Sequence, residues 1–393
     1  MRKCDILDIG RILLLYLLAW FSATSIIYFI KYKGREEDKR LLISPLIVAI
    51  RFRYEFRQAD RFYGRRKFLL FLDTGVIVLT ILAALLYFMV AKNIVSILMR
   101  GERIPIATPI IPGLTISIEL FLYLLPGLSI AIILHELGHA IASRISGVSV
   151  KSTGIIILGG LIPAAFVEPH ENELRKSPLR SKLRIYSAGV FFNGIIALIV
   201  WILLSLLMSG GFYTVISDVS PGSWADKYGL EPNTIVTEIE ANGTKFQELG
   251  DFIGYLTSLR RENGGTLSNL TLIVVFRTIS GEEITVIKPS ANDTSSGNNY
   301  ERIGVSFNTV PSKLVEVGLP LNYALSIFYI VWYIFVVNLG IGAINAAPLF
   351  ITDGAHVVTE VLKEKMGEKG EKIAYAISLA TLLLLLPGLS LAI

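Results

Sequence analysis

The stretch Leu124-Leu125-Pro126-Gly127-Leu128-Ser129-Ile130-Ala131-Ile132-Ile133-Leu134-His135-Glu136-Leu137-Gly138-His139-Ala140-Ile141-Ala142-Ser143 sets an H-E-x-x-H motif inside an apolar run of membrane-spanning length. On a helix, side chains four residues apart share one face, so His135 and His139 can bind the same metal ion. Glu136 then lies beside that metal, where it can take a proton from a bound water. The sequence therefore predicts a metal site within a membrane helix.

The three ionisable residues of this motif are too costly within a membrane span to occur there by coincidence. The chain has only four histidines, so the pattern seldom arises by accident. A charged group at the centre of a membrane span costs about 2.5–3.5 kcal/mol on insertion scales, and ionisable groups there are functional as a rule. Three such residues within five positions indicate a metal or close partners.

The composition agrees with a membrane protein. Hydrophobic residues make up 53% of the chain and charged residues 18%, with a mean hydropathy of +0.60. Soluble domains are less apolar and more charged. The single cysteine, Cys4, excludes an internal disulfide framework and an all-cysteine zinc site. The first apolar run lacks a small-residue cleavage site, so no cleavable signal peptide is predicted.

About six membrane spans of roughly 20 apolar residues are predicted. They lie at 12–30, 68–91, 115–146, 183–209, 319–344 and 372–392. The third contains Pro126-Gly127, where a kink or a broken start is expected. Residues 31–67 carry twelve Lys or Arg against five acidic residues. By the positive-inside rule this loop is cytoplasmic. We expect it to hold anionic lipid headgroups rather than nucleic acid.

The remaining loops give a consistent topology. Loops 147–182 and 354–371 are also basic and fall on the cytoplasmic side, which puts the metal motif toward the cytoplasmic half of the cell membrane. Residues 210–318 then lie outside, and this segment contains three glycosylation sequons, at Asn242, Asn269 and Asn292.

Residues 210–318 form a polar domain within the membrane protein. Strands are expected at Thr271–Thr278 and Glu283–Lys288, joined by a Ser280-Gly281 turn. The stretches 219–230 and 235–243, with Arg302-Ile303-Gly304-Val305 as a closing strand, resemble the PDZ domains of proteases. Such domains bind peptides by adding a strand to a sheet edge. A filter that excludes folded proteins by bulk is the alternative role.

A catalytic zinc usually takes three protein ligands, so one more is needed. After the fifth span the chain reads Asn345-Ala346-Ala347-Pro348-Leu349-Phe350-Ile351-Thr352-Asp353-Gly354-Ala355-His356. Pro348 interrupts the helix, and Asp353 opens a new one at the depth of His139. Asp353 is therefore the candidate third ligand, with a helix cap as its alternative role. His356 could be a supporting residue or the ligand itself, and His170 lies in a polar loop where it is expected to be solvated.

These motifs together resemble the site-2 protease family of intramembrane zinc metalloproteases. The resemblance rests on H-E-x-x-H in a span, on N-x-x-P-x-x-x-x-D-G-x-H, and on Ser187-Ala188-Gly189-Val190-Phe191-Phe192-Asn193. Two motifs depart from the family pattern: the usual Leu-Asp-Gly-Gly-His is Thr352-Asp353-Gly354-Ala355-His356 here, and Gly189 is followed by Val190 rather than proline. The resemblance implies one Zn²⁺ per chain on His135, His139 and Asp353, and cleavage of peptide bonds within transmembrane segments of membrane proteins.

In that mechanism Glu136 deprotonates the zinc-bound water, which attacks the scissile carbonyl. Asn193 would donate a hydrogen bond to the developing oxyanion, or alternatively join two spans by a hydrogen bond. The glycine-rich apolar segment Gly154–Pro163 is too short to span the membrane. It suggests a re-entrant strand or hairpin whose edge holds an extended substrate, with a buried structural loop as the alternative.

The sequence thus predicts a polytopic α-helical membrane protein with a re-entrant β segment and an inserted α/β PDZ-like domain. Its expected regions are an N-terminal part with the basic loop (1–113), two parts of the catalytic core (114–209 and 319–393) and the insert (210–318). Two other functions compete: a membrane-anchored H-E-x-x-H peptidase with a distant glutamate ligand, and a catalytically inactive scaffold. The intact motif residues disfavour the scaffold.

Overall fold

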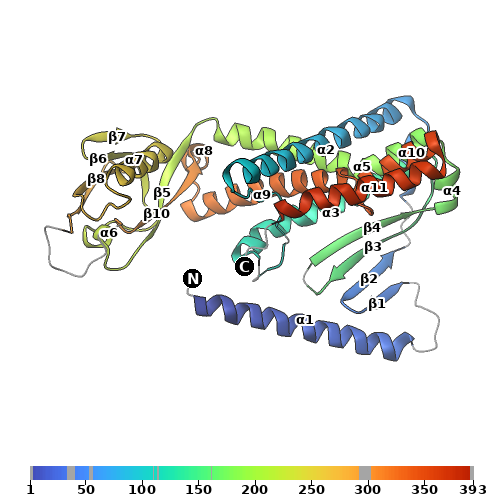
Figure 1. The fold of residues 1–393 in the computed structure, drawn as a ribbon, viewed down its shortest axis with the longest axis horizontal. Coiled ribbons are helices and arrows are strands. Elements are labelled where there is room, and N and C mark those ends of the chain that lie inside the picture. The colour runs from blue at the N-terminus through green and yellow to red at the C-terminus, as the bar shows by residue number, and fades with distance from the viewer. Residues whose placement is uncertain are drawn as a thin grey trace. The chain divides into compact units, whose positions relative to one another are not determined.

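The fold was analysed in a computed structural model of the chain. It describes residues 3–32, 40–52, 56–108, 110–112, 115–160, 162–291 and 302–389. The chain divides into two compact units: Met1–Trp201 with Ile330–Ile393, and Ile202–Tyr329. The helices and strands that lie wholly or partly in the first unit are α1 (Lys3–Tyr32), β1 (Leu41–Ser44), β2 (Ile47–Phe52), η1 (Arg57–Phe62), α2 (Arg66–Arg100), α3 (Ile118–Ile145), β3 (Val150–Leu158), β4 (Ile162–Pro169), α4 (Glu171–Lys176), α5 (Leu179–Met208), α9 (Leu321–Ala346), α10 (Asp353–Met366), α11 (Glu368–Leu385) and η2 (Leu386–Gly388) (Figure 1).

Five helical segments among the described residues are long and apolar enough to cross a membrane. They are α2, α3, α5, α9 and the stretch Glu368–Gly388. The prediction of a polytopic helical membrane protein is therefore confirmed. The first predicted span, 12–30, lies within the helix α1. Residues 390–392 of the last predicted span lie outside the described residues.

Helix α3 carries the H-E-x-x-H motif without interruption. It begins at Ile118, where the Ser117 side chain accepts a hydrogen bond from the Leu120 N–H, and it ends at Ile145. Pro126 lies inside the helix, so the helix does not start anew there, and the other expectation, a kink, stays a prediction. Proline is tolerated within membrane helices because neighbouring helices and polar side chains satisfy the freed backbone groups.

A four-stranded sheet accompanies the helices, in the order β1-β2-β3-β4 with all neighbours antiparallel. The hairpin expected around Gly154–Pro163 is present and longer than predicted, because β3 and β4 pair from Val150 to Pro169. Strands β1 and β2 were not predicted; they lie within the predicted basic loop 31–67. Short apolar runs there, Leu41–Ile43 and Ile47–Ile50, extend the hairpin, so this segment is not only a loop. Strand β4 forms one edge of the sheet.

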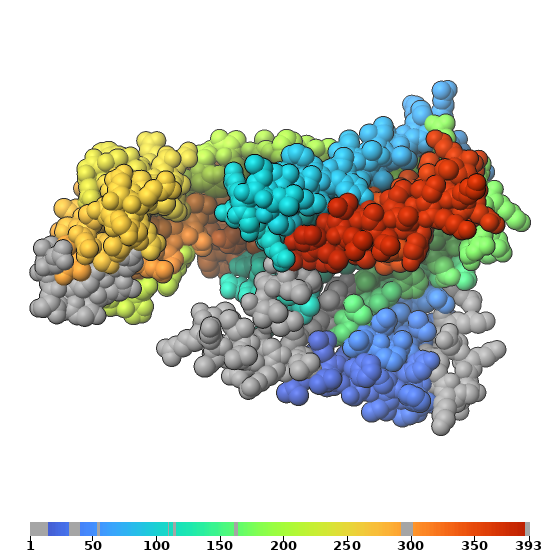
Figure 2. Space-filling model, viewed as in Figure 1, coloured from blue at the N-terminus to red at the C-terminus, as the bar shows by residue number. Residues whose placement is uncertain are grey.

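Apolar side chains pack four helices of the first unit against one another. One apolar cluster joins α2, α5, α9 and α10; its buried members are Leu79, Leu82, Leu86, Val190, Ala343, Ala346, Ala347 and Val357. Helices α2 and α11 lie side by side, blue to cyan and red in Figure 2, and a 2.6 Å hydrogen bond joins Tyr87 Oη to Thr381 Oγ1. The first unit is thus a helical bundle with a sheet.

The second unit is a small α/β domain. Its elements are β5 (Phe212–Val219), α6 (Trp224–Lys227), β6 (Ile235–Ala241), β7 (Thr244–Phe246), α7 (Leu249–Glu262), β8 (Leu272–Thr278), β9 (Glu283–Lys288), β10 (Val305–Pro311) and α8 (Ser312–Glu316). The sheet has the order β10-β5-β6-β8-β9, and β7 pairs with β6. The two strands predicted from the sequence are β8 and β9, and Gly281 takes a left-handed conformation (φ 86°) in the turn between them. Of the predicted closing strand 302–305, only Val305 is in β10.

Candidate active site

Helices α3 and α10 bring three possible metal ligands together. The Nε2 atoms of His135 and His139 lie 3.2 Å apart. Asp353 Oδ2 lies 3.3 Å from His135 Nε2, and Asp353 Oδ1 lies 3.3 Å from His139 Nε2. Donors about 2.05 Å from a tetrahedral zinc ion are separated by about 3.3 Å. The three side chains therefore fit one metal ion, with a fourth position left for water, as in catalytic rather than structural zinc sites.

The burial of this group also fits a cation. Asp353 is 9% exposed and His135 8%. Among the described residues, Asp353 Oδ2 is a buried atom without a well-formed hydrogen bond. A carboxylate is costly to bury unless a charge or a metal compensates it. This unpaired oxygen beside two histidines is what a bound divalent cation would satisfy.

The break after α9 places Asp353. Pro348 ends the helical run, and the Thr352 hydroxyl accepts a hydrogen bond from the Ala355 N–H at the start of α10. Thr352 is therefore the helix cap, and Asp353 is free for another role. Gly354 permits the close approach of the two segments, because a Cβ there would lie 2.0 Å from the Ala346 carbonyl oxygen.

Each imidazole is held by a partner on α5. His139 Nδ1 lies 2.8 Å from the Ile185 carbonyl oxygen, so Nδ1 donates and the Nε2 lone pair faces the other ligands. His135 Nδ1 lies 3.3 Å from Asn193 Nδ2. Asn193 is completely buried, and its Oδ1 has no hydrogen-bond partner among the described residues. Asn193 thus contacts the edge of the His135 ring that faces away from Nε2.

Gly189 leaves the space in which the ligands meet. A Cβ at this position would lie 2.5 Å from His139 Nε2 and 2.6 Å from His135 Nε2. Such distances are far below van der Waals contact, so any side chain here would displace the imidazoles. The Ser187–Asn193 motif on α5 therefore leaves space for the imidazoles at Gly189 and provides a hydrogen-bonding side chain at Asn193.

Glu136 points from α3 toward the sheet. Its Oε2 accepts a 2.8 Å hydrogen bond from the Val167 N–H of β4. The half-buried carboxylate is thus held at the edge strand, on the residue that directly follows His135. An edge strand has backbone groups that can pair with another chain. The site therefore combines a candidate base with a candidate binding edge.

The two remaining histidines lie outside the ligand group. Among the described residues, the only set of side chains close enough to share a metal is His135, His139 and Asp353. His356 is exposed and stacks on Tyr186, with ring centroids 4.9 Å apart. His170 is exposed and directly precedes α4. The alternative ligands considered from the sequence are thus not brought to the site.

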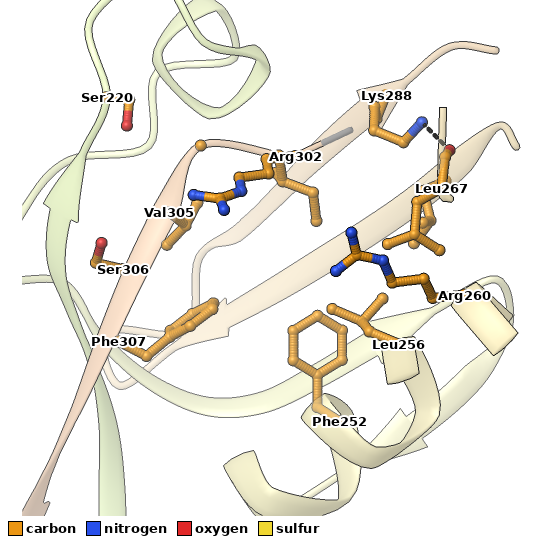
Figure 3. A pocket seen from close by; sticks show the side chains of 13 residues that line it. Ser220, Phe252, Leu256, Arg260, Leu267, Lys288, Arg302, Val305, Ser306 and Phe307 are labelled. Atoms are coloured by element: carbon orange, nitrogen blue, oxygen red, sulfur yellow. Dashed lines mark hydrogen bonds between the residues drawn. The ribbon is translucent and has the colours of Figure 1, made fainter. Parts of the chain in front are cut away.

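A groove in the second unit is a separate candidate site. It has a volume of about 260 Å³ and lies between β10 and α7 (Figure 3). Phe252 and Leu256 of α7 face Phe307 of β10 across it, and Arg302 and Arg260 lie at its upper end. Among the described residues, strand β10 pairs with β5 alone, and its second edge faces the groove.

Two contacts of the candidate site could not be predicted from the sequence: those of the Ile185 carbonyl with His139 and of the Val167 N–H with Glu136. Both are backbone groups, which every residue possesses, so no side-chain motif identifies them. The only signal was indirect: Ile185 precedes the Ser187–Asn193 motif, and Val167 follows the glycine-rich hairpin turn.

Comparison with known proteins places this geometry in a family. The model of peptidase family M50 matches residues 123–385, which contain all three candidate ligands. "Uncharacterized protein MJ0971" of Methanocaldococcus jannaschii is 28% identical over 64% of this chain and 61% of its own length. "Membrane-bound transcription factor site-2 protease homolog" of Arabidopsis thaliana is 27% identical over 39% and 31%.

A third relative, "Putative zinc metalloprotease Cj1068" of Campylobacter jejuni, is 30% identical over 36% of this chain and 45% of its own length. The chain thus spans between about a third and three fifths of the length of these relatives. The family match covers more than half of the chain and confirms the resemblance read from the motifs. On this ground the chain belongs to peptidase family M50.

Proposed function

We propose that this protein is a zinc metalloprotease that cuts peptide bonds within the transmembrane segments of membrane proteins. The observation that carries the proposal is the meeting of His135, His139 and Asp353 within 3.3 Å of one another on helices of a membrane bundle. The zinc metalloprotease and site-2 protease names of the relatives support zinc as the metal.

Zinc, when bound by these residues, supplies a Lewis acid and lowers the pKa of a water molecule in the open position. Glu136 is the base that accepts a proton from this water as its oxygen bonds to the scissile carbonyl carbon. When the C–N bond breaks, Glu136 returns the proton to the leaving amine. The products are a carboxylic acid and an amine, which together contain the atoms of the peptide and one water, and Glu136 is again a carboxylate.

Asn193 positions His135 in this proposal. For Nε2 to be a ligand, the proton of the neutral imidazole must be on Nδ1, which then requires an acceptor. Turning the Asn193 amide so that Oδ1 faces Nδ1 satisfies both His135 and the otherwise unpaired Oδ1. The role expected from the resemblance, a hydrogen bond to the oxyanion, would require the amide to leave this contact.

Strand β4 is the proposed docking edge for the substrate. A transmembrane helix must unwind before its peptide bonds can be cut, and the exposed backbone groups then need partners within the apolar region. Backbone donors alternate between the two sides of a strand, so the Ala165 N–H faces the same way as the Val167 N–H that reaches Glu136. An extended segment paired along this edge would pass beside the candidate base.

The α/β insert is proposed to bind peptides in the groove between β10 and α7. The open edge of β10 can accept an added strand, and the apolar floor of Phe252, Leu256 and Phe307 can hold a side chain. The exposed Arg302 would favour acidic peptides. These features support the PDZ-like interpretation of the insert and a role in selecting substrates.

The proposed location is a multi-pass position in the cell membrane, with the basic segments cytoplasmic and the insert outside. The positive-inside rule supports this orientation. Asn242 and Asn269 of the predicted sequons are exposed, whereas Asn292 lies outside the described residues. The competing peptidase interpretation, with a distant glutamate as third ligand, has less support, because Asp353 lies 3.3 Å from both histidines.

The test uses purified protein in lipid nanodiscs and a panel of tagged single transmembrane helices. Wild type is expected to bind one zinc per chain and to cut within the apolar segment, as located by mass spectrometry. Glu136→Gln should keep its zinc and lose about 10²–10⁴-fold in cleavage rate. Retained turnover in this variant would remove Glu136 as the base, and cuts only outside the apolar segments would overturn intramembrane cleavage.

A further inference from the structure

A cluster of cations at the start of α2 is not used by the proposed chemistry. Arg61 lies in η1, and Arg65, Arg66 and Lys67 lie at the start of α2. All four side chains are exposed, and among the described residues none of them forms an ion pair with a carboxylate. We propose that this cluster binds the headgroup of an anionic phospholipid and thereby stabilises the end of α3 that follows the metal motif.

The cluster lies at the level of lipid headgroups. The apolar part of α2 begins at Phe68, directly after the three consecutive cations. The polar-to-apolar boundary of a spanning helix lies at the membrane interface, where phosphates are found. Tyr63 is 63% exposed and lies against Gly147, at the position where interfacial aromatic rings are enriched.

The neighbouring acidic groups do not neutralise the cluster. The Asp60 carboxylate is bound by Arg144 through two hydrogen bonds, one of them 2.6 Å long. Asp73, further along α2, is bound by Arg180 and Arg184. Both of these carboxylates are therefore paired with arginines of other helices, and within the described part of the chain the four cations present a net positive surface that fits a phosphate.

The cluster is arranged by one aromatic ring. The Arg61 guanidinium lies 4.6 Å from the centroid of the Phe62 ring, and the Arg65 guanidinium lies 5.9 Å from it. Both cations are therefore held around the same ring. A shared support fixes two guanidinium groups near each other, which suits one phosphate better than scattered surface charges would.

The same segment is attached to α3. Phe62 packs against the apolar cluster that contains Ala142, Ile145 and Ile185. The Gly64 N–H donates to the Ile145 carbonyl oxygen at 3.3 Å, and Asp60 binds Arg144 as described. Ile185 also provides the carbonyl that orients His139. A headgroup held by Arg61 and Arg65 would thus hold η1 against the end of the metal-binding helix.

The experiment measures lipid selectivity in phosphatidylcholine nanodiscs with trace spin-labelled phosphatidylglycerol or phosphatidylcholine. Wild type should immobilise phosphatidylglycerol preferentially. Since each cation at an anionic surface contributes about a fivefold preference, Arg61→Gln/Arg65→Gln should lose at least about fivefold. The charge-matched control is Lys365→Gln/Lys369→Gln, whose exposed lysines lie on α10 and α11. This control should keep the wild-type preference.

Amide hydrogen exchange of residues 141–146 is the second measurement. It should slow when phosphatidylglycerol replaces part of the phosphatidylcholine, in wild type and in the control but not in the arginine double variant. The inference would be overturned if wild type showed no preference for phosphatidylglycerol or if the lysine control lost the preference equally. It would also be overturned if the amide exchange rates of wild type did not change with the lipid. Both measurements can be made on zinc-free protein without a substrate, so they are independent of the proposed protease function.

Discussion

His139 Nε2 lies 3.3 Å from Asp353 Oδ1, although the two residues belong to helices α3 and α10 at opposite ends of the family match. This relationship turns two histidines of one helix into a three-ligand group. It exists because Pro348 follows the end of α9, Thr352 caps α10, and Gly354 lets the new helix approach Ala346 closely. The predictions below test this group and the residues that support it.

Loss of Asp353 should remove the metal, whereas loss of His356 should not. Asp353→Ala removes one of three ligands, and we expect zinc affinity to fall by more than about 100-fold, beyond the effect of losing a supporting partner. His356→Ala removes an exposed ring stacked on Tyr186 and should keep one zinc per chain. Metal analysis after dialysis against a zinc buffer measures both. Zinc retained by Asp353→Ala but lost by His356→Ala would reverse the assignment.

Gly189→Ala should damage the metal site without unfolding the bundle. Its new Cβ would lie 2.5 Å from His139 Nε2, so one or both imidazoles must move. We expect zinc affinity to fall at least about tenfold, because ligand orientation is worth 10–100-fold in affinity. The matched control is Gly340→Ala in α9, where a Cβ would have no neighbour within 4 Å. Equal zinc affinity in the two variants would show that Gly189 has no special role.

Substitutions of Asn193 distinguish positioning of His135 from stabilisation of an oxyanion. If Asn193 accepts from His135 Nδ1, Asn193→Ala should lower zinc affinity by about 10–100-fold, whereas Asn193→Asp, an acceptor only, should keep it. Zinc affinity and kcat are to be measured for both variants. The opposite pattern, unchanged zinc affinity with a reduced kcat in both, would indicate the oxyanion role.

The β3–β4 hairpin should be less stable in acid because of Glu168. A 2.6 Å hydrogen bond from Lys151 and another from the Ser152 hydroxyl lower the pKa of Glu168 in the folded protein. A lowered pKa gives stability that is fully present above the unfolded-state value of about 4.3 and is lost as pH falls through the folded-state value.

Because Glu168 is partly exposed, this contribution should stay below about 1 kcal/mol. Glu168→Gln should remove it, so the variant's unfolding midpoint should change less than that of wild type between about pH 6 and about pH 3. Parallel curves for the two proteins would contradict the assignment. The measurement is a thermal unfolding scan in the same detergent at each pH.

The sequence predicted what depends on local spacing. His135 and His139 share a helix face because helical side chains repeat every 3.6 residues, and this holds wherever the helix lies. Likewise, a long apolar run must form a helix within a membrane, since no water satisfies its backbone. Strands β8 and β9 were predicted by alternation and a turn signal. For Asp353, the sequence supplied a candidate and left His356 and His170 open.

Tertiary structure decided everything that joins distant segments. It brought Asp353 to the two histidines and His356 to Tyr186, because the orientation of α10 depends on the packing of Gly354 rather than on helical periodicity. It also added β1 and β2 to the β3–β4 hairpin and brought the Ile185 carbonyl and the Val167 N–H to the site. Backbone groups are the same in every residue, so only the folded chain can show which of them meet the histidines and Glu136.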